Sequence, residues 1–140
     1  MRVIFLVLVL FVTGSVAQSA FAIESESDTI VQLKQQMEIQ KTYAVITGMK
    51  RIVQYVANTD LSCATGADCI ALPIGSRACG GPSSFIVTSA ENRSLEVLKQ
   101  SIELVTKAER DANLKFGMMS VCSFEMPPDL GCSNNLCEQF

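Results

Sequence analysis

Six cysteines constrain this chain more than any other feature of its sequence. They stand at Cys63, Cys69, Cys79, Cys122, Cys132 and Cys137 in a chain of 140 residues. An even number of cysteines in a short chain that also carries an export signal predicts a framework of disulfide bonds. Because a small domain buries only a limited core, such bonds supply a large share of its stability. We therefore expect the fold to be stapled by about three disulfides.

The export signal lies at the N-terminus. Met1-Arg2 precedes the apolar run Val3–Val12, and small and polar residues then lead to Ala20-Phe21-Ala22. A short basic end, a short hydrophobic segment and an A-x-A motif are typical of a cleaved secretory signal peptide. An uncleaved anchor is the alternative, but the apolar run is short for a bilayer span. We predict cleavage after residue 22 and a periplasmic or secreted protein with no membrane span.

The cysteine spacing limits the pairing without fixing it, since six cysteines allow fifteen pairings. Three cysteines precede residues 80–121 and three follow them. If all six pair internally, an odd number of bridges crosses that segment, so at least one bridge joins residues 63–79 to residues 122–137. The spacing contains no C-x-x-C pair, and the chain has no histidine. Structural zinc and a thioredoxin-like redox pair are therefore disfavoured.

The absence of histidine also excludes several catalytic mechanisms. Neither a Ser-His-Asp triad nor a Cys-His pair can be assembled, and no cofactor motif is present. Loss of Arg2 with the leader leaves 10 basic and 14 acidic residues, a net charge of −4. With no basic block, nucleic acid is not an expected partner. Glu96 and Glu103 keep a carboxylate enzyme open as an alternative, although they fit a solvated helix face better. We expect a protein that is not an enzyme.

Hydrophobic periodicity predicts six elements in the order α-β-β-α-β-β. A 3–4 spacing of apolar residues favours helices, whereas alternation and β-branched residues favour strands. The expected spans are a long helix over 30–56, strands over 69–74 and 84–88, a helix over 95–116, and strands over 119–124 and 136–140. We expect an α+β fold, in which a small antiparallel sheet carries two helices packed on it.

Local signals refine these boundaries. Residues 23–29 are expected to form a frayed acidic start to the first helix, which could bend near Gly48. Thr88 and Glu91 fit a capping box that would begin the second helix. Three parts of the chain follow: the signal peptide (1–22), the acidic start and long helix (23–58), and a disulfide-rich α+β domain (59–140).

The loop Gly75–Ser83 is the candidate binding site. It contains Arg77, Gly80, Gly81 and Pro82, directly around Cys79. The two glycines can adopt positive φ and the proline stiffens the exit, so a tight turn beside a disulfide is the simplest interpretation. The functional interpretation takes Arg77 as an exposed side chain on a stiff loop, which would lose little entropy on docking. A trypsin-like protease could accept that arginine, which would make the protein an inhibitor.

The cysteine pattern also resembles a family. Cys63-x5-Cys69, then Cys79-Gly80-Gly81-Pro82, and finally Cys132-x4-Cys137 are similar to uncharacterised small exported bacterial six-cysteine proteins with a CGGP signature. The resemblance covers roughly residues 60–138 and omits the long first helix. It implies an oxidised, exported α+β domain, and it supplies no activity and no catalytic residues.

Two functional hypotheses follow. The first is a non-enzymatic exported binding module that presents the loop Gly75–Ser83 to a protein partner in the envelope or outside the cell. The second is a structural or interaction protein whose first helix, with its apolar stripe between Ile30 and Val56, pairs with a partner or with itself. The oligomeric state is left open.

Overall fold

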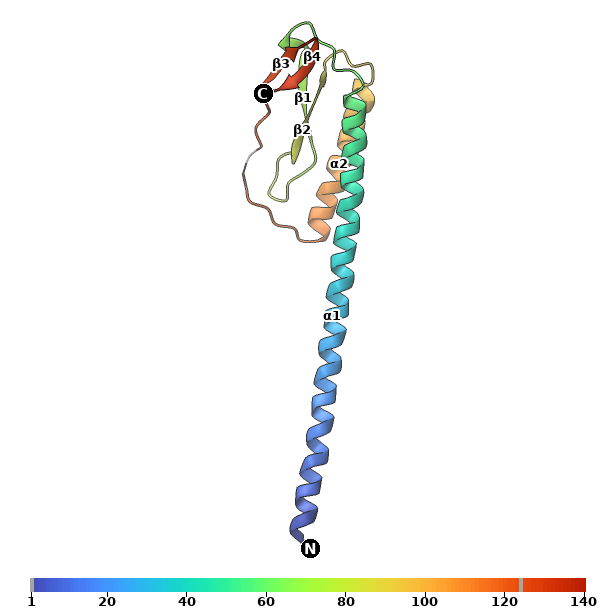
Figure 1. The fold of residues 1–140 in the computed structure, drawn as a ribbon, viewed down its shortest axis with the longest axis vertical. Coiled ribbons are helices and arrows are strands. Elements are labelled where there is room, and N and C mark those ends of the chain that lie inside the picture. The colour runs from blue at the N-terminus through green and yellow to red at the C-terminus, as the bar shows by residue number, and fades with distance from the viewer. Residues whose placement is uncertain (1, 124) are drawn as a thin grey trace. The chain divides into compact units, whose positions relative to one another are not determined.

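The first helix is longer than the sequence predicts. The computed structural model describes the backbone of residues 2–123 and 125–140, and the side chains of residues 27–123 and 125–140. Its chain divides into two compact units, Met1–Gln40 and Lys41–Phe140. Helix α1 (Arg2–Ala57) forms the described part of the first unit and continues into the second (Figure 1).

The expected frayed start at residues 23–29 is therefore wrong. Residues 2–29 contain no proline and a single glycine, so nothing in the local sequence stops a helix from extending through them. Helix α1 also passes through Gly48 without interruption. Cleavage after residue 22 stays a prediction, and it would shorten α1 to residues 23–57. No helix in the described part of the chain is both long and apolar enough to cross a membrane.

The second unit contains a β-hairpin at the predicted positions. Strand β1 (Cys69–Ile74) pairs antiparallel with β2 (Ser84–Ser89), in a register that runs from Cys69 opposite Ser89 to Ile74 opposite Ser84. Because this sheet has two strands, each strand has an unpaired edge. Pro73, which has no N–H to donate, is tolerated in β1 for that reason.

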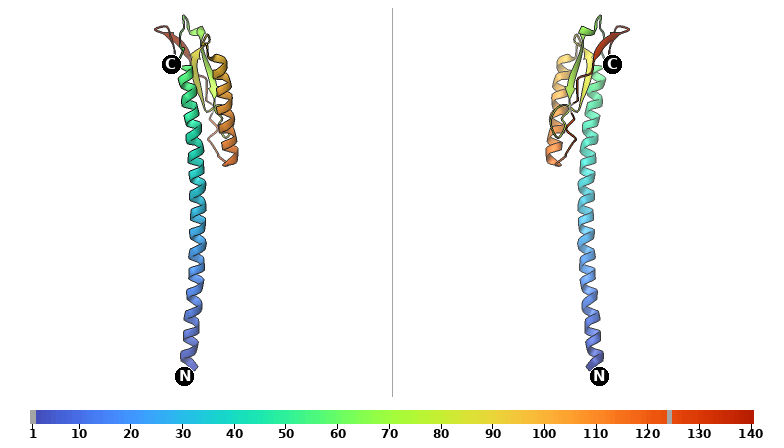
Figure 2. Two further views of the ribbon diagram at one scale, coloured as in Figure 1. Left: turned by 90° about the vertical axis from the view of Figure 1, so that its right-hand side faces the viewer. Right: turned by 90° about the vertical axis from the view of Figure 1, so that its left-hand side faces the viewer.

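Helix α2 (Leu95–Lys115) and the end of α1 pack on this hairpin. Figures 1 and 2 together show the two helices side by side against the same face of the β1–β2 hairpin. The apolar stripe of α2 meets apolar residues of both strands and of α1 in one core. Its buried members are Ile46, Val53, Ala57, Ile74, Ile86, Leu98, Ile102, Val105 and Ala112. A Leu98→Ala change at this fully buried position would cost about 2–5 kcal/mol.

A second hairpin closes the fold. Strand β3 (Leu130–Ser133) pairs antiparallel with β4 (Leu136–Gln139). Asn134 and Asn135 connect the strands with φ of 53° and 59°. Two successive positive φ angles define the type I′ turn that suits a tight hairpin. Asparagine is one of the residues that most readily adopt positive φ, which explains the Asn-Asn pair in this turn.

Two disulfides link the hairpins. Cys63 bonds to Cys132 in β3, and Cys69 at the start of β1 bonds to Cys137 in β4. Both bridges join residues 63–79 to residues 122–137. The sequence predicted at least one such bridge if all six cysteines pair, whereas two cross here and two cysteines are free. The backbone reinforces this link, because the amide of Cys137 donates to the carbonyl of Leu61 at 2.8 Å. The α+β class and the element order are confirmed.

The strands are arranged differently from the prediction in two respects. They form two separate two-stranded sheets, whereas a single sheet was expected. A strand was also predicted over residues 119–124. Residues 119–123 form no strand, so that prediction is wrong there, and Phe124 lies outside the described residues. Met119 and Val121 are 93% and 85% exposed, so these side chains have no surface to pack against. Residues 130–133 pair with β4 instead, because the Asn-Asn turn and the Cys63–Cys132 bridge fix their register.

The capping box at Thr88 is also wrong. Thr88 belongs to β2, and its buried hydroxyl donates to the carbonyl of Ala57 at 3.0 Å. The side-chain amide of Asn92 donates to the same carbonyl and to that of Asp60, each at 3.3 Å. Thr88 thus satisfies carbonyl groups at the end of α1, which otherwise lack partners. Helix α2 begins later, after Ser94.

Candidate functional site

The loop between β1 and β2 has a tightly packed base. Gly75 is buried with φ of 78°, and a Cβ added there would lie 2.0 Å from Ser83 Oγ and 2.1 Å from Glu109 Oε2. The amide of Ser83 donates to the carbonyl of Ile74 at 3.0 Å and closes the base. Both the φ angle and the lack of space therefore require glycine at position 75.

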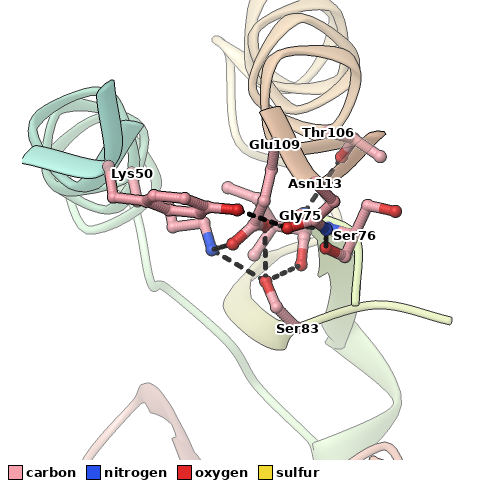
Figure 3. A network of polar contacts seen from close by, with 9 residues as sticks. Lys50, Gly75, Ser76, Ser83, Thr106, Glu109 and Asn113 are labelled. Atoms are coloured by element: carbon pink, nitrogen blue, oxygen red, sulfur yellow. Dashed lines mark hydrogen bonds and ion pairs between the residues drawn. The ribbon is translucent and has the colours of Figure 1, made fainter. Parts of the chain in front are cut away.

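A network of charged and polar groups holds this base against both helices (Figure 3). Lys50 of α1 forms an ion pair of 2.8 Å with Glu109 of α2, and it donates to Ser83 Oγ at 2.7 Å. Glu109 also accepts from the Ser83 hydroxyl at 2.9 Å and from the Ser76 amide at 2.8 Å. The Lys50 and Glu109 side chains are 25% and 12% exposed, so water screens the pair only partly. The network ties one loop to two helices.

The network continues along α2. The Gly75 amide donates to Thr106 Oγ1 at 3.0 Å, and the Asn113 side-chain amide donates to the Ser76 carbonyl at 2.7 Å. The hydroxyl of Tyr43 donates to Asn113 Oδ1 at 2.5 Å. Burial, with the nearby charge of Glu109, raises the pKa of Tyr43. Tyr43 therefore keeps its proton and acts as a hydrogen-bond donor at neutral pH.

The tip of the loop forms the expected tight turn. The Arg77 amide donates to the Gly81 carbonyl, and the Gly80 amide donates to the Arg77 carbonyl, both at 3.0 Å. Gly80 and Gly81 have φ of 102° and 80°, so their predicted positive φ is confirmed. Both are exposed, and an added Cβ at either would meet no atom within 4 Å. Pro82 is half-buried at the exit.

Arg77 is not displayed as the sequence predicts. Its guanidinium donates to the carbonyl and hydroxyl oxygens of Ser123, at 2.6 and 2.9 Å, and forms an ion pair with Glu125. Its side chain is 22% exposed. The prediction of a free arginine on a stiff loop is therefore wrong, because Ser123 and Glu125 bind its guanidinium. Sequence patterns do not reveal this contact, since its partners lie more than 40 residues away in a segment without regular structure.

Only four of the six cysteines are bonded in disulfides. Two of the expected three disulfides are present, whereas Cys79 and Cys122 are exposed free thiols. The two thiols lie in hydrogen-bond contact, and the Ser120 hydroxyl donates to Cys79 Sγ at 3.3 Å. The hydrogen bond from Cys122, followed by that from Ser120, lowers the pKa of Cys79. The contact with Cys79 raises the pKa of Cys122.

One further cysteine cluster bears on metal binding. In the part of the chain that the structure describes, the sulfur atoms of Cys63, Cys69 and Cys137 all lie within 4.8 Å of one another. All three sulfurs are bonded in disulfides. Because a metal needs the thiolate form of cysteine, this cluster acts as a covalent link in its oxidised state.

Two surface hollows lie beside these elements, and the sequence reasoning predicted neither. A groove of about 530 Å³ is lined by Leu72, Pro73 and Ile102 together with basic residues of α2. A smaller hollow of about 240 Å³ lies between the loop and the end of α2, with Ser76, Ala78 and Met118 among its lining residues. Arg110 lines both hollows and forms no ion pair within the described residues. The available signal was the basic series Lys99, Lys107 and Arg110 on one helix.

The fold and site define a small α+β protein in which two disulfides join two β-hairpins. Comparison of the chain with protein families, with curated proteins and with solved structures found no match. The function is therefore argued from the geometry of the site alone, and the resemblance to exported proteins with a CGGP signature stays a prediction.

Proposed function

We propose that this chain is an exported, non-enzymatic binding module, periplasmic or secreted, that presents the loop Gly75–Ser83 to a protein partner. The observation that carries the proposal is the network of Lys50, Glu109 and Ser83 at the base of the loop. A loop fixed before docking loses less conformational entropy when it binds. The two disulfides support export, because such bonds persist in oxidising compartments.

The partner is expected to insert an acidic side chain beside the loop. The hollow of about 240 Å³ is lined by Ser76 and the exposed Ala78 of the loop and by Arg110 of α2. Arg110 forms no ion pair among the described residues and can therefore take a carboxylate from a partner. Inhibition through an inserted Arg77 is not part of this proposal, since Ser123 and Glu125 hold that side chain.

Affinity capture with the oxidised mature protein, from its native compartment, tests the proposal. Gly81→Val changes the tip of the loop at a position with positive φ, and Arg110→Glu reverses the charge beside it. Each variant should retain less than a tenth of the captured partner. Arg51→Glu, the same charge reversal at an exposed position on α1, is the matched control and should capture normally. Undiminished capture by the first two variants would exclude this loop as the site.

A second candidate function is self-association through α1. Val45, Ile52 and Tyr55 are 58%, 66% and 74% exposed, which is unusual for large apolar side chains on a helix beside a core. Association of two copies would remove these side chains from water. Size-exclusion chromatography with light scattering decides the question: the mature protein would be a dimer and Ile52→Lys a monomer. Leu104→Lys on α2, also at an exposed leucine, is the control.

A further inference from the structure

Cys79 and Cys122 differ from the other four cysteines. Cys69 and Cys137 are buried, Cys63 and Cys132 are half-buried, and all four are bonded in the link between the hairpins. Cys79 and Cys122 are exposed, unbonded and adjacent. They come from two separate segments, the loop Gly75–Ser83 and the irregular residues that follow α2. A bond between them is therefore not needed to hold the core together.

The surroundings of the two thiols are unequal. Cys79 receives the hydroxyl hydrogen bond of Ser120, and its own amide donates to Ser120 Oγ at 3.3 Å. The guanidinium of Arg77, two residues before Cys79, adds a positive charge that favours a thiolate. The Cys122 thiol donates a weak hydrogen bond to the carbonyl of Ser120 at 3.9 Å, and such a contact favours the protonated thiol over the thiolate. Cys79 is the better nucleophile of the pair.

We propose that Cys79 and Cys122 form a redox-active dithiol that exchanges with low-molecular-weight disulfides such as oxidised glutathione. The Cys79 thiolate attacks one sulfur of the small disulfide, which forms a mixed disulfide and releases one thiol. Cys122 then loses its proton to solvent and attacks the Cys79 sulfur, which releases the second thiol and leaves a Cys79–Cys122 bond. Two protein thiols are oxidised, and one small disulfide is reduced to two thiols.

The reaction changes the loop as well as the sulfur atoms. In the dithiol form, noncovalent contacts of Arg77 and Cys79 hold the loop against Ser120, Ser123 and Glu125. A Cys79–Cys122 bond would make that attachment covalent and reversible. Because the bond lies outside the core, it can open and close while the two hairpin bridges remain intact.

Redox titration of the full mature protein tests this inference. The protein is equilibrated in buffers of graded reduced and oxidised glutathione, the free thiols are alkylated, and intact mass with peptide mapping counts them. Two thiols, mapped to Cys79 and Cys122, should titrate at ratios where the other four cysteines stay bonded. The proposal is wrong if both thiols stay free in fully oxidised glutathione, or if all six cysteines titrate together.

Single variants test the order of attack. With excess oxidised glutathione at neutral pH, Cys122→Ser should accumulate a glutathione adduct on Cys79, because the resolving thiol is absent. Cys79→Ser should form its adduct at least ten times more slowly, and Ser120→Ala should slow the reaction of Cys79 several-fold in the Cys122→Ser background. Equal adduct rates in the two single variants would overturn the assignment of Cys79 as nucleophile. Circular dichroism confirms that each variant keeps its fold.

Discussion

Removal of the two disulfides should show that they are energetically coupled. Cys63–Cys132 and Cys69–Cys137 close chain loops with sequence separations of 69 and 68. In the chain-entropy description, a single bridge across such a loop stabilises the fold by about 4 kcal/mol. When one bridge is already present, the other closes only the ring formed by residues 63–69 and 132–137. For a ring of roughly 13 residues the same relation gives about 3 kcal/mol.

Replacing either pair of cysteines by alanine should therefore cost about 3 kcal/mol, whereas replacing both pairs should cost about 7 kcal/mol. The loss in the combined variant then exceeds the sum of the separate losses by about 1 kcal/mol. This sign is the one expected when two bridges partly share one task, because each bridge still restrains most of the loop after the other has been removed. The denatured chain also expands once the second bridge is lost, so the denaturant m-value should rise.

The assay is urea unfolding followed by circular dichroism, in a Cys79→Ser/Cys122→Ser background that prevents disulfide exchange. The background variant with both bridges intact is the reference. Strictly additive losses, or a loss near 4 kcal/mol for each separate pair, would refute the nested-loop reasoning. If the combined variant is unfolded in water, its stability is recovered by extrapolation from solutions with a stabilising osmolyte.

Three further predictions concern single residues: the effect of substituting Gly75 or Asn135 on stability, and the titration of Asp68. Gly75→Ala should destabilise the protein by about 2 kcal/mol or more, because its Cβ would collide with Ser83 and Glu109 in a strained backbone conformation. Hydrogen bonds from the amides of Thr65 and Ala64 lower the pKa of Asp68, so its stabilising effect is present at neutral pH and is lost as the pH falls through that lowered pKa. Asn135→Gly should stabilise by about 0.5–1 kcal/mol, since glycine adopts the φ of 59° without strain.

Each of these outcomes has a direct measurement and control. Thermal unfolding should show a smaller loss for Gly81→Ala than for Gly75→Ala, since Gly81 has positive φ but open space around it. NMR titration of the Asp68 carboxyl carbon should give a pKa below the ordinary value of about 3.9, and a higher value contradicts the hydrogen-bond assignment. Asn135→Ala should lower the melting temperature; a gain there would count against the type I′ turn.

Most of the structural features that the sequence predicted correctly depend on residues that are close together in the chain. Alternation of apolar residues placed β1 at 69–74, and the 3–4 stripe beginning at Leu95 placed α2. Cysteine parity predicted at least one bridge between residues 63–79 and 122–137 if all six cysteines pair; two such bridges are present, although two cysteines are free. The positive φ of Gly80 and Gly81 followed from glycine's freedom within a short loop. Apart from the bridges, each of these features is set by residues close together in the chain.

The features that the sequence did not predict depend on contacts between distant segments. Thr88 matched a capping box locally, but its hydroxyl satisfies the carbonyl of Ala57, 31 residues earlier. Arg77 matched an exposed site, but it pairs with Glu125, 48 residues later. The pair of Lys50 and Glu109 lies on helices whose own charge patterns fit a solvated face. In each case, a tertiary partner determines the environment of the side chain, and a single sequence does not identify that partner.

The position of the two bridges sets how the protein withstands proteases. Both connect residues before 70 to residues after 131, so a cut anywhere in residues 70–131 yields two fragments that stay attached through sulfur. This protected span includes α2, the loop Gly75–Ser83 and the exposed residues 118–123. Helix α1 lies outside the covalent ring, so digestion at its start would release peptides while the rest of the molecule stays whole under non-reducing conditions.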